Sequence, residues 1–195
     1  MSLTDEVVSL SLQSIKKVQE RKFVMVVESV QELFDFIEQS PSCFHVIDNA
    51  KKMLKKEGFE ELCENKKWEI KEGGKYFVTR NLSSIIAFKV PSKEFRSFHI
   101  VSSHSDSPTF KIKDNPEQSV KGKYVQLNTE RYGGMIYSTW FDRPLSVAGR
   151  VLVKTDKGVE TKLVNIDRDL LVIPNLAIHM DRNANDGMKY NPQIN

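Results

Sequence analysis

The sequence has 195 residues, of which 39% are hydrophobic and 28% are charged, with seven prolines and nine glycines. This composition is typical of a folded globular protein, and the length suffices for one ample domain or two small ones. The formal charge of +3 is small, and basic residues are interleaved with acidic ones instead of forming a basic block, so we expect no nucleic-acid partner. No apolar stretch is long enough to cross a bilayer, and the polar start MSLTDEVV lacks a signal-peptide pattern. We therefore expect a cytoplasmic protein that has no membrane partner.

Helical periodicity predicts that the first quarter of the chain is mostly helical. Apolar residues recur at helical spacing from Val26 to Ile37, and a fainter version of the same pattern covers residues 5–18. The triplet Ser40-Pro41-Ser42 is typical of a helix start. Apolar positions over residues 43–54 then form one helical face, and we expect this helix to stop at Gly58, after two lysines that favour a helix C-terminus.

Three β-rich runs follow. The runs KYFVTR, residues 75–80, and SIIAFKV, residues 84–90, flank Asn81-Leu82-Ser83 and predict a hairpin. The run from Phe95 to Val101 lacks alternation between apolar and polar residues, which is typical of an inner strand buried on both faces. We expect such a strand to carry His104 at its end.

The character of the sequence changes beyond Lys113, where we expect strands and no helix. The short β-type runs in this half are 124–130, 135–140, 147–154 and 159–164. The segment Thr155 to Gly158 predicts a hairpin turn, with glycine at the position that tolerates positive φ. We place a domain boundary near Asp114, so that residues 1–114 and 115–195 belong to different domains.

The stretch FHIVSSHSDSP, residues 98–108, ends an apolar run in small hydroxyl residues around a histidine and an aspartate. In extended backbone, residues two apart point to the same side, so His104 and Asp106 face one target while Ser105 points away. A neutral imidazole is a good zinc ligand, and a carboxylate beside it can hold its other ring nitrogen. Taken alone, such a pair is more often an ordinary polar contact, so both interpretations stay open at this point. A serine hydrolase is disfavoured, because no G-x-S-x-G elbow occurs.

Several long stretches together resemble one family, the M18 zinc aminopeptidases, which include aspartyl aminopeptidase. The resembling pieces run in family order from about Ser40 to Asn183 and are SPSCFHVIDNAKKMLKKEGFEEL, WEIKEGGKYFVTRNLSSIIAFKV, HSDSP, YGGMIYSTWFDRPLSVAGRVLVK and LVNIDRDLLVIPNLAIHMDRN. The resemblance implies an α/β fold class: part of a catalytic domain with helices packed on a mixed sheet, followed by a β-rich inserted assembly domain. It also implies a homo-oligomer in which dimers assemble further.

The resemblance implies a metal-dependent aminopeptidase that removes the first residue of a peptide with zinc-activated water, using two zinc ions in each complete subunit. The resemblance implies that His104 is a zinc ligand and that Asp106 orients the imidazole of His104. His179 is the last residue of the piece IPNLAIH, and the resemblance implies that it contacts substrate across a subunit interface. An ordinary polar residue on the flank of a β segment is an equally good interpretation of His179. Peptides that start with Asp or Glu are the first substrates to consider. His45 and His99 fit structural roles better than metal binding.

The family's remaining metal ligands and general base come from motifs that follow the assembly domain, and the sequence shows none of them before Asn195. One candidate ligand cannot hold a catalytic zinc ion alone. We therefore expect the parent protein to be an enzyme and the 195-residue chain to be inactive by itself. The alternative is a truncated, noncatalytic module that retains an assembly or interaction role.

Overall fold

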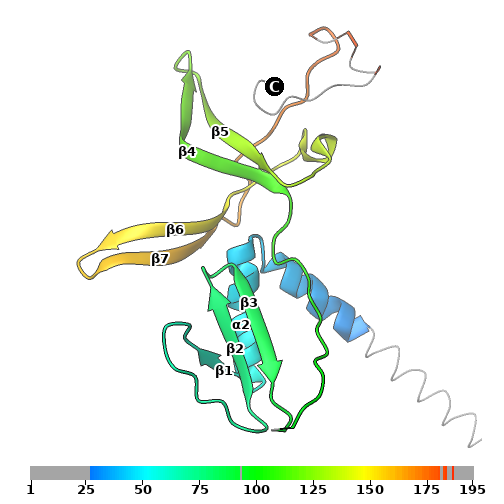
Figure 1. Cartoon of the computed structure of the whole chain (residues 1–195). Helices are drawn as coiled ribbons and strands as arrows, with labels where there is room; N and C mark the ends of the chain where they lie inside the picture. Colours follow the sequence, from blue (N-terminus) through cyan, green and yellow to red (C-terminus); the bar gives the residue numbers. More distant parts are fainter. Residues whose placement is uncertain (1–26, 93, 181, 184–185, 187–195) are drawn as a thin grey trace, which may run out of the picture.

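The computed structural model describes residues 27–92, 94–180, 182–183 and 186 (Figure 1). Residues 27–38 form a helix, which agrees with the predicted periodicity, whereas the fainter pattern over residues 5–18 lies outside the described residues. No helix within these ranges is both long enough and apolar enough to span a membrane.

Helix α2, Cys43–Lys56, begins and ends where the sequence predicts. Its N-cap is Ser42, whose backbone is extended, and two lysines occupy the last turn. Beyond the helix, Gly58 adopts a φ of +79°, a conformation that glycine takes without a steric penalty. The inward face contains Ile47, which is almost completely buried.

A three-stranded mixed sheet packs against α2 and confirms the expected fold class. Strand β1, Glu60–Leu62, runs parallel to β2, Lys75–Arg80, and β2 pairs antiparallel with β3, Ser84–Lys89. In Figure 1 the helix lies behind this sheet. Tyr76 and Phe77 of β2 complete the small core, since among the described residues only these two and Ile47 are buried hydrophobic side chains.

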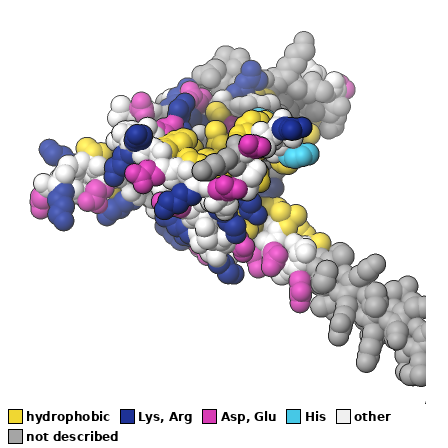
Figure 2. Space-filling model, turned by 60° about the horizontal axis from the view of Figure 1, so that its bottom comes forward, with side chains coloured by type: hydrophobic (Ala, Val, Ile, Leu, Met, Phe, Trp, Pro, Cys, Tyr) yellow, Lys and Arg dark blue, Asp and Glu magenta, His cyan; other side chains and the backbone are white. Residues whose placement is uncertain are grey.

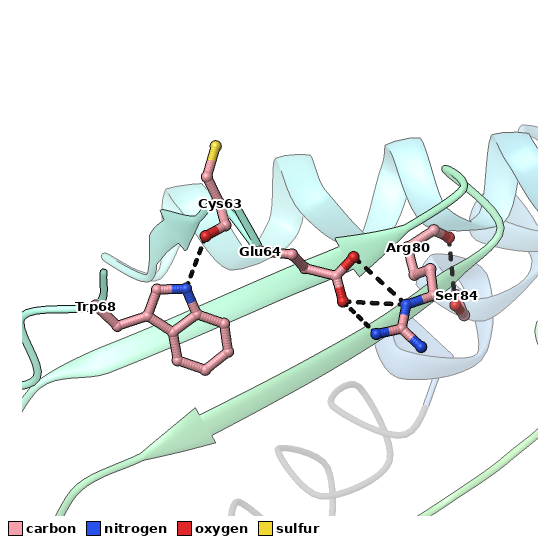
Figure 3. A network of polar contacts seen from close by, with 5 residues as sticks. All are labelled: Cys63, Glu64, Trp68, Arg80 and Ser84. Atoms are coloured by element: carbon pink, nitrogen blue, oxygen red, sulfur yellow. Dashed lines mark hydrogen bonds and ion pairs between the residues drawn. The ribbon is translucent and has the colours of Figure 1, made fainter. Parts of the chain in front are cut away.

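Polar contacts hold the loop between β1 and β2 against the sheet (Figure 3). The Trp68 indole N–H donates to the carbonyl of Cys63 at 2.7 Å. The Arg80 guanidinium donates to Glu64 Oε1 through Nη2 at 2.6 Å and through Nε at 3.0 Å, so one carboxylate oxygen accepts both short bonds, and Nε lies 3.4 Å from Oε2. The Arg80–Glu64 pair joins the end of β2 to the residues that follow β1, and the Trp68 bond closes the loop on itself.

The second half of the chain is built mainly from two antiparallel hairpins. Strands β4, Thr109–Val120, and β5, Tyr124–Tyr132, form the first, and β6, Ala148–Thr155, and β7, Gly158–Asn165, form the second. In Figure 1 both hairpins extend away from the mixed sheet. The predicted turn between β6 and β7 is confirmed, with Thr155 paired to Gly158 and a φ of +119° at the glycine.

One expected β-type run in this half is helical instead. Within residues 135–140, the structure forms a short 3₁₀ helix, Tyr137–Trp140. The expectation of a strand was wrong because the aromatic side chains at both ends of this turn pack on one ring: Phe110 stacks on Tyr137 with centroids 6.0 Å apart and meets Trp140 edge-on at 5.4 Å. Packing on β4 thus overrides the local β preference.

The predicted domain boundary at residue 114 falls inside β4. Pairing of β4 with β5 is irregular between Ile112 and Glu117, and Asn115 has a φ of +53°. Such an irregularity bends a strand and alters its twist. The division into residues 1–114 and 115–195 stays a prediction.

The expectation of a buried inner strand from Phe95 to Val101 was wrong. These residues form no strand in the structure, and their side chains are exposed, with Val101 98% accessible. An inner strand requires a neighbour on each side. The described part of the chain supplies none, because β3 pairs only with β2. Figure 2 shows hydrophobic side chains uncovered on one face of the molecule.

Candidate metal-ligating site

His104 and Asp106 meet in the segment between β3 and β4. The ring nitrogen Nδ1 of His104 lies 2.9 Å from Oδ1 of Asp106. The side chain of His104 is 91% exposed and that of Asp106 is 33% exposed, so the imidazole projects into solvent from a partly covered carboxylate. His104 therefore has one ring nitrogen held by the protein and the other directed away from this contact.

The contact determines which nitrogen of His104 can bind a metal ion. An ionised carboxylate only accepts hydrogen bonds, so Nδ1 must donate its hydrogen to Asp106. In the neutral ring this leaves the lone pair on Nε2. A histidine held by a carboxylate in this way is the arrangement that orients and strengthens imidazole ligands in zinc sites. The donor chemistry of the pair thus fits one ligand of a zinc site.

Tyr132, the last residue of β5, is a third member of the site. Its hydroxyl donates to Oδ2 of Asp106 at 2.6 Å, while Oδ1 accepts from His104. The hydrogen bond from Tyr132, followed by that from His104, holds the pKa of Asp106 below its usual range. The same bond raises the pKa of the Tyr132 hydroxyl, because ionising the tyrosine would place a second negative charge beside the carboxylate. Asp106 therefore stays ionised near neutral pH.

Neighbouring segments position the loop that carries the pair. Ser105 points away from the pair, and its hydroxyl donates to the carbonyl of Ser83, in the turn between β2 and β3, at 2.8 Å. At the other end of the loop, Gly133 lies against Pro108, where a Cβ on the glycine would lie 3.5 Å from the proline. Gly133 also has a φ of +77°, a conformation that disfavours other residues. The bond of Ser105 thus attaches the segment of residues 104–108, the site loop, to the turn between β2 and β3. The contact of Pro108 with Gly133 attaches the same loop to the end of β5.

The other predicted site residue, His179, does not join this pair. It is exposed in a turn at residues 178–180, and none of the contacts in the described part of the chain links it to His104 or Asp106. Its role across a subunit interface stays a prediction. Among the described residues, no group of three or more histidine, cysteine, aspartate or glutamate side chains could hold a metal ion.

The two remaining histidines differ in their surroundings. The Nδ1 atom of His45 lies 2.8 Å from the hydroxyl of Ser42, at the start of α2, and partial burial lowers the pKa of the ring. This contact agrees with a structural role. His99 lies in the exposed segment that was expected to be an inner strand, so the structure gives it no buried position.

The sequence alone did not point to Tyr132. This residue stands opposite Thr109 in the β4–β5 pairing, which brings its hydroxyl back to Asp106, three residues before Thr109. The irregularity of β4 lies between this pair and the hairpin turn, so the register at Tyr132 cannot be counted back from the turn. The usable signal was a tyrosine two residues beyond the β-type run 124–130, and a tyrosine near the end of such a run is too common a feature to single this residue out.

Comparison with known sequences identifies relatives over most of the chain. Residues 36–195 match the family described as "Aminopeptidase I zinc metalloprotease (M18)". The "Probable M18 family aminopeptidase 2" of Clostridium acetobutylicum is 55% identical over 171 residues, which cover 86% of this chain and 40% of that protein. The "Aspartyl aminopeptidase" of Dictyostelium discoideum is 46% identical over 167 residues, covering 84% of this chain and 34% of the relative.

The fold is also similar to that of solved structures. The chain aligns with a subunit in the "Structure of S. cerevesiae mApe1 dodecamer" with a TM-score of 0.69 and 30% identity, over 76% of this chain and 36% of that one. The chain thus spans 34–40% of the length of these two curated relatives. With a family match over residues 36–195, the chain belongs to the M18 family of zinc metalloproteases.

Proposed function

We propose that this chain contributes part of the active site of a zinc aminopeptidase, with His104 as a zinc ligand and Asp106 as the residue that orients it. The observation that carries the proposal is the 2.9 Å contact between Nδ1 of His104 and the Asp106 carboxylate, which leaves Nε2 with its lone pair toward solvent. A zinc ion at such a site polarises the scissile carbonyl and lowers the pKa of a water molecule. In this role His104 would bind the zinc ion and Asp106 would orient the imidazole, and neither side chain has to transfer a proton.

The proposed reaction removes the N-terminal residue of a peptide. Peptides that start with Asp or Glu are the first substrates, by analogy with the aspartyl aminopeptidase of Dictyostelium discoideum. His179 is proposed to contact substrate from a neighbouring subunit, and two zinc ions are proposed for each complete site. The dodecamer named for the yeast relative supports a homo-oligomer built from copies of this subunit. The proposed compartment is the cytoplasm.

The 195 residues are proposed to be inactive by themselves. A catalytic zinc ion requires three protein ligands as well as a position for water or substrate. Within the described ranges only His104 is a histidine whose ring nitrogen is held by a carboxylate. The same ranges contain no cluster of three potential metal ligands. The other ligands and the general base would have to come from residues that the described part of the chain does not contain.

A noncatalytic assembly or interaction module is the second candidate function. Two observations favour this second function. The described residues contain no cluster of three potential metal ligands, and many apolar side chains of the two hairpins and of the helix at residues 27–38 are exposed and available to a partner. The two functions differ in metal content and in turnover. A complex that contains this chain together with a full complement of zinc and peptidase activity is expected only for the enzyme.

The zinc-ligand role is tested by titrating Zn²⁺ into the chain with isotope-labelled histidine and following all four rings by nuclear magnetic resonance. A carboxylate behind a histidine ligand is worth about 10–100-fold in metal affinity, so we expect His104 to respond at about tenfold lower zinc concentration than His99 or His179. The variant Asp106→Ala removes this advantage. Asp48→Ala, which removes an exposed carboxylate from α2, is the matched control and leaves the order unchanged.

Two results would contradict the proposal. A response of His99 or His179 at lower zinc concentration than His104 would remove the basis for the ligand role. Turnover of aspartyl- or leucyl-p-nitroanilide by the purified chain with added zinc would show that the 195 residues are sufficient for catalysis, against the ligand count given above.

A further inference from the structure

We propose that Tyr132 is a positioning residue for His104, acting through Asp106. This inference rests on the proposed zinc-ligand role of His104 and deepens it. The hydroxyl of Tyr132 bonds to Oδ2 of Asp106 at 2.6 Å, while Oδ1 of the same carboxylate faces the imidazole at 2.9 Å. The three side chains therefore form a chain of donors and acceptors that ends at Nε2 of His104, the nitrogen that keeps its lone pair.

The geometry gives Tyr132 a task that Asp106 cannot perform alone. A carboxylate side chain rotates about a broad, roughly two-fold torsion, so one contact at Oδ1 does not hold its plane. A second donor at Oδ2 holds both oxygens, and an O–H donor to an ionised oxygen at 2.6 Å is in the range of strong, charge-assisted hydrogen bonds. With its plane held, Asp106 presents Oδ1 to Nδ1 and favours the tautomer that carries the hydrogen there.

Tyr132 also connects the ligand to a different part of the chain. It is the last residue of β5 and pairs with Thr109, the first residue of β4. Side chains alternate between the two faces of a strand, so a slip of one residue in this pairing would turn the hydroxyl away from Asp106. Gly133, which follows directly, lies against Pro108 and keeps the strand end beside the site loop. The register of a β hairpin thereby sets the orientation of a predicted metal ligand.

The test reads the tautomer of His104 in the metal-free chain, so it is independent of zinc binding and of peptidase activity. Histidine is labelled with nitrogen-15, and long-range proton–nitrogen spectra are recorded at about pH 8, where an ordinary imidazole is neutral. In the unmutated chain we expect the form with hydrogen on Nδ1 to predominate at His104. In Tyr132→Phe we expect the ratio of this form to the other to fall by about two- to fivefold, the range expected for one polar contact at a partly exposed site.

Two further variants bracket that result. Asp106→Ala removes the acceptor and sets the value for complete loss, so Tyr132→Phe should lie between it and the unmutated chain. Tyr124→Phe removes the same oxygen from the exposed tyrosine at the opposite end of β5 and should keep the original ratio. The original ratio in Tyr132→Phe, or an equal fall in Tyr124→Phe, would overturn the positioning role.

A second measurement needs no substitution and covers the case in which Tyr132→Phe does not fold. Donation of the hydroxyl hydrogen to a carboxylate moves the signal of the ring carbon Cζ downfield, so in chain labelled with carbon-13 at tyrosine Cζ we expect a downfield shift at Tyr132 relative to Tyr124. Its absence would overturn the inference. Failure of the zinc titration together with success here would remove the metal role and keep the coupling of Tyr132 to His104, so the two proposals fail separately.

Discussion

Glu61 lies between two lysine ammonium groups of α2. Its Oε1 is 2.7 Å from Nζ of Lys51, and its Oε2 is 2.8 Å from Nζ of Lys55. Burial alone would raise the pKa of Glu61, but the hydrogen bonds and charges of the two lysines outweigh it and hold the pKa below its usual range. Because the side chain is partly exposed, solvent screens this cluster, and its contribution is that of a favourable surface network.

We expect Glu61→Gln to lower the free energy of unfolding by about 0.5–1 kcal/mol at neutral pH. A carboxyl whose pKa is depressed by folding stabilises the fold above its unfolded pKa, about 4.3, and loses that contribution as the pH falls through the lower folded value. The difference between the variant and the unmutated chain should therefore shrink toward zero near pH 3. Urea unfolding at several pH values measures it.

The neighbouring exposed residue supplies the control for that prediction. Glu60→Gln removes the same charge one position earlier in β1, where the side chain is exposed. It should change stability by less than Glu61→Gln at neutral pH. A loss for Glu61→Gln that stays constant down to pH 3 would show that the effect comes from packing and not from the lysine pair.

At the site itself, the part that was predictable from sequence is the part that is local. His104 and Asp106 are two residues apart, so extended backbone alone is enough to bring them to one side, and the structure places them 2.9 Å apart. Tyr132 is 26 residues from Asp106, and its place depends on strand register. His179 depends on a neighbouring subunit, which this chain cannot test. Its role and the metal itself therefore stay predictions.

The turn between β2 and β3 is an element under backbone strain. Both Asn81 and Leu82 have positive φ, 53° and 56°, and the N–H of Ser83 bonds back to the carbonyl of Arg80 at 3.1 Å. Positive φ at both central positions is the pattern of a type I′ turn, which prefers asparagine followed by glycine. Asparagine suits its position, whereas leucine has a Cβ in a conformation that costs about 1–2 kcal/mol.

We expect Leu82→Gly to stabilise the chain by about 0.5–1 kcal/mol, since relief of strain exceeds the added flexibility of glycine in the unfolded state. Leu82→Ala is the matched control: it removes the same exposed side chain but keeps the Cβ, so it should bring no gain. Urea unfolding measures both. Equal effects of the two substitutions would mean that the lost leucine side chain, and not backbone strain, decides the outcome.

Element prediction succeeded where a segment needs only itself or its sequence neighbour. Helix α2 follows from its cap and its apolar face, and the β2–β3 and β6–β7 hairpins follow from short turns between β-rich runs. The run from Phe95 to Val101 has equally good β composition, yet a strand also requires a partner for its backbone groups. Amino-acid composition indicates that a segment favours β structure, but it does not indicate whether a neighbouring strand is available to pair with it.

Across the whole molecule, Arg150 of β6 joins three segments that are distant in sequence. Its guanidinium carbon lies 4.2 Å from the ring centroid of Phe44 in α2, a favourable cation–π arrangement. Its Nη1 also donates to the carbonyl of Asn81 at 2.8 Å and to Oδ1 of the same residue at 3.1 Å. The second hairpin thus contacts the turn whose Ser83 carbonyl holds the site loop through Ser105. One arginine links the β-rich half to the element that positions His104.

At the scale of the whole molecule, the exposed segment around Phe98 and Ile100 is the surface that we most expect another protein chain to cover. Both side chains are largely exposed, and Val30, Leu33 and Phe34 on the helix of residues 27–38 are about half exposed. Within the segment, Phe98 also meets the ring of Phe95 edge-on, with centroids 4.9 Å apart, and monomeric proteins rarely leave large apolar patches uncovered. A β-type segment that pairs with no strand in the described part of the chain is also a template for pairing with another chain.

We therefore expect the purified chain to self-associate, with a weight-average mass in sedimentation velocity that rises with concentration. Phe98→Ser combined with Ile100→Ser should weaken this association by about tenfold or more, because burying each side chain only in part is still worth about 1 kcal/mol. The control is Tyr124→Ser combined with Val125→Ser, which removes comparably exposed apolar side chains from the start of β5. If both pairs of substitutions weaken association alike, general stickiness explains it. If the control leaves association intact, residues 95–101 are the surface that another chain covers.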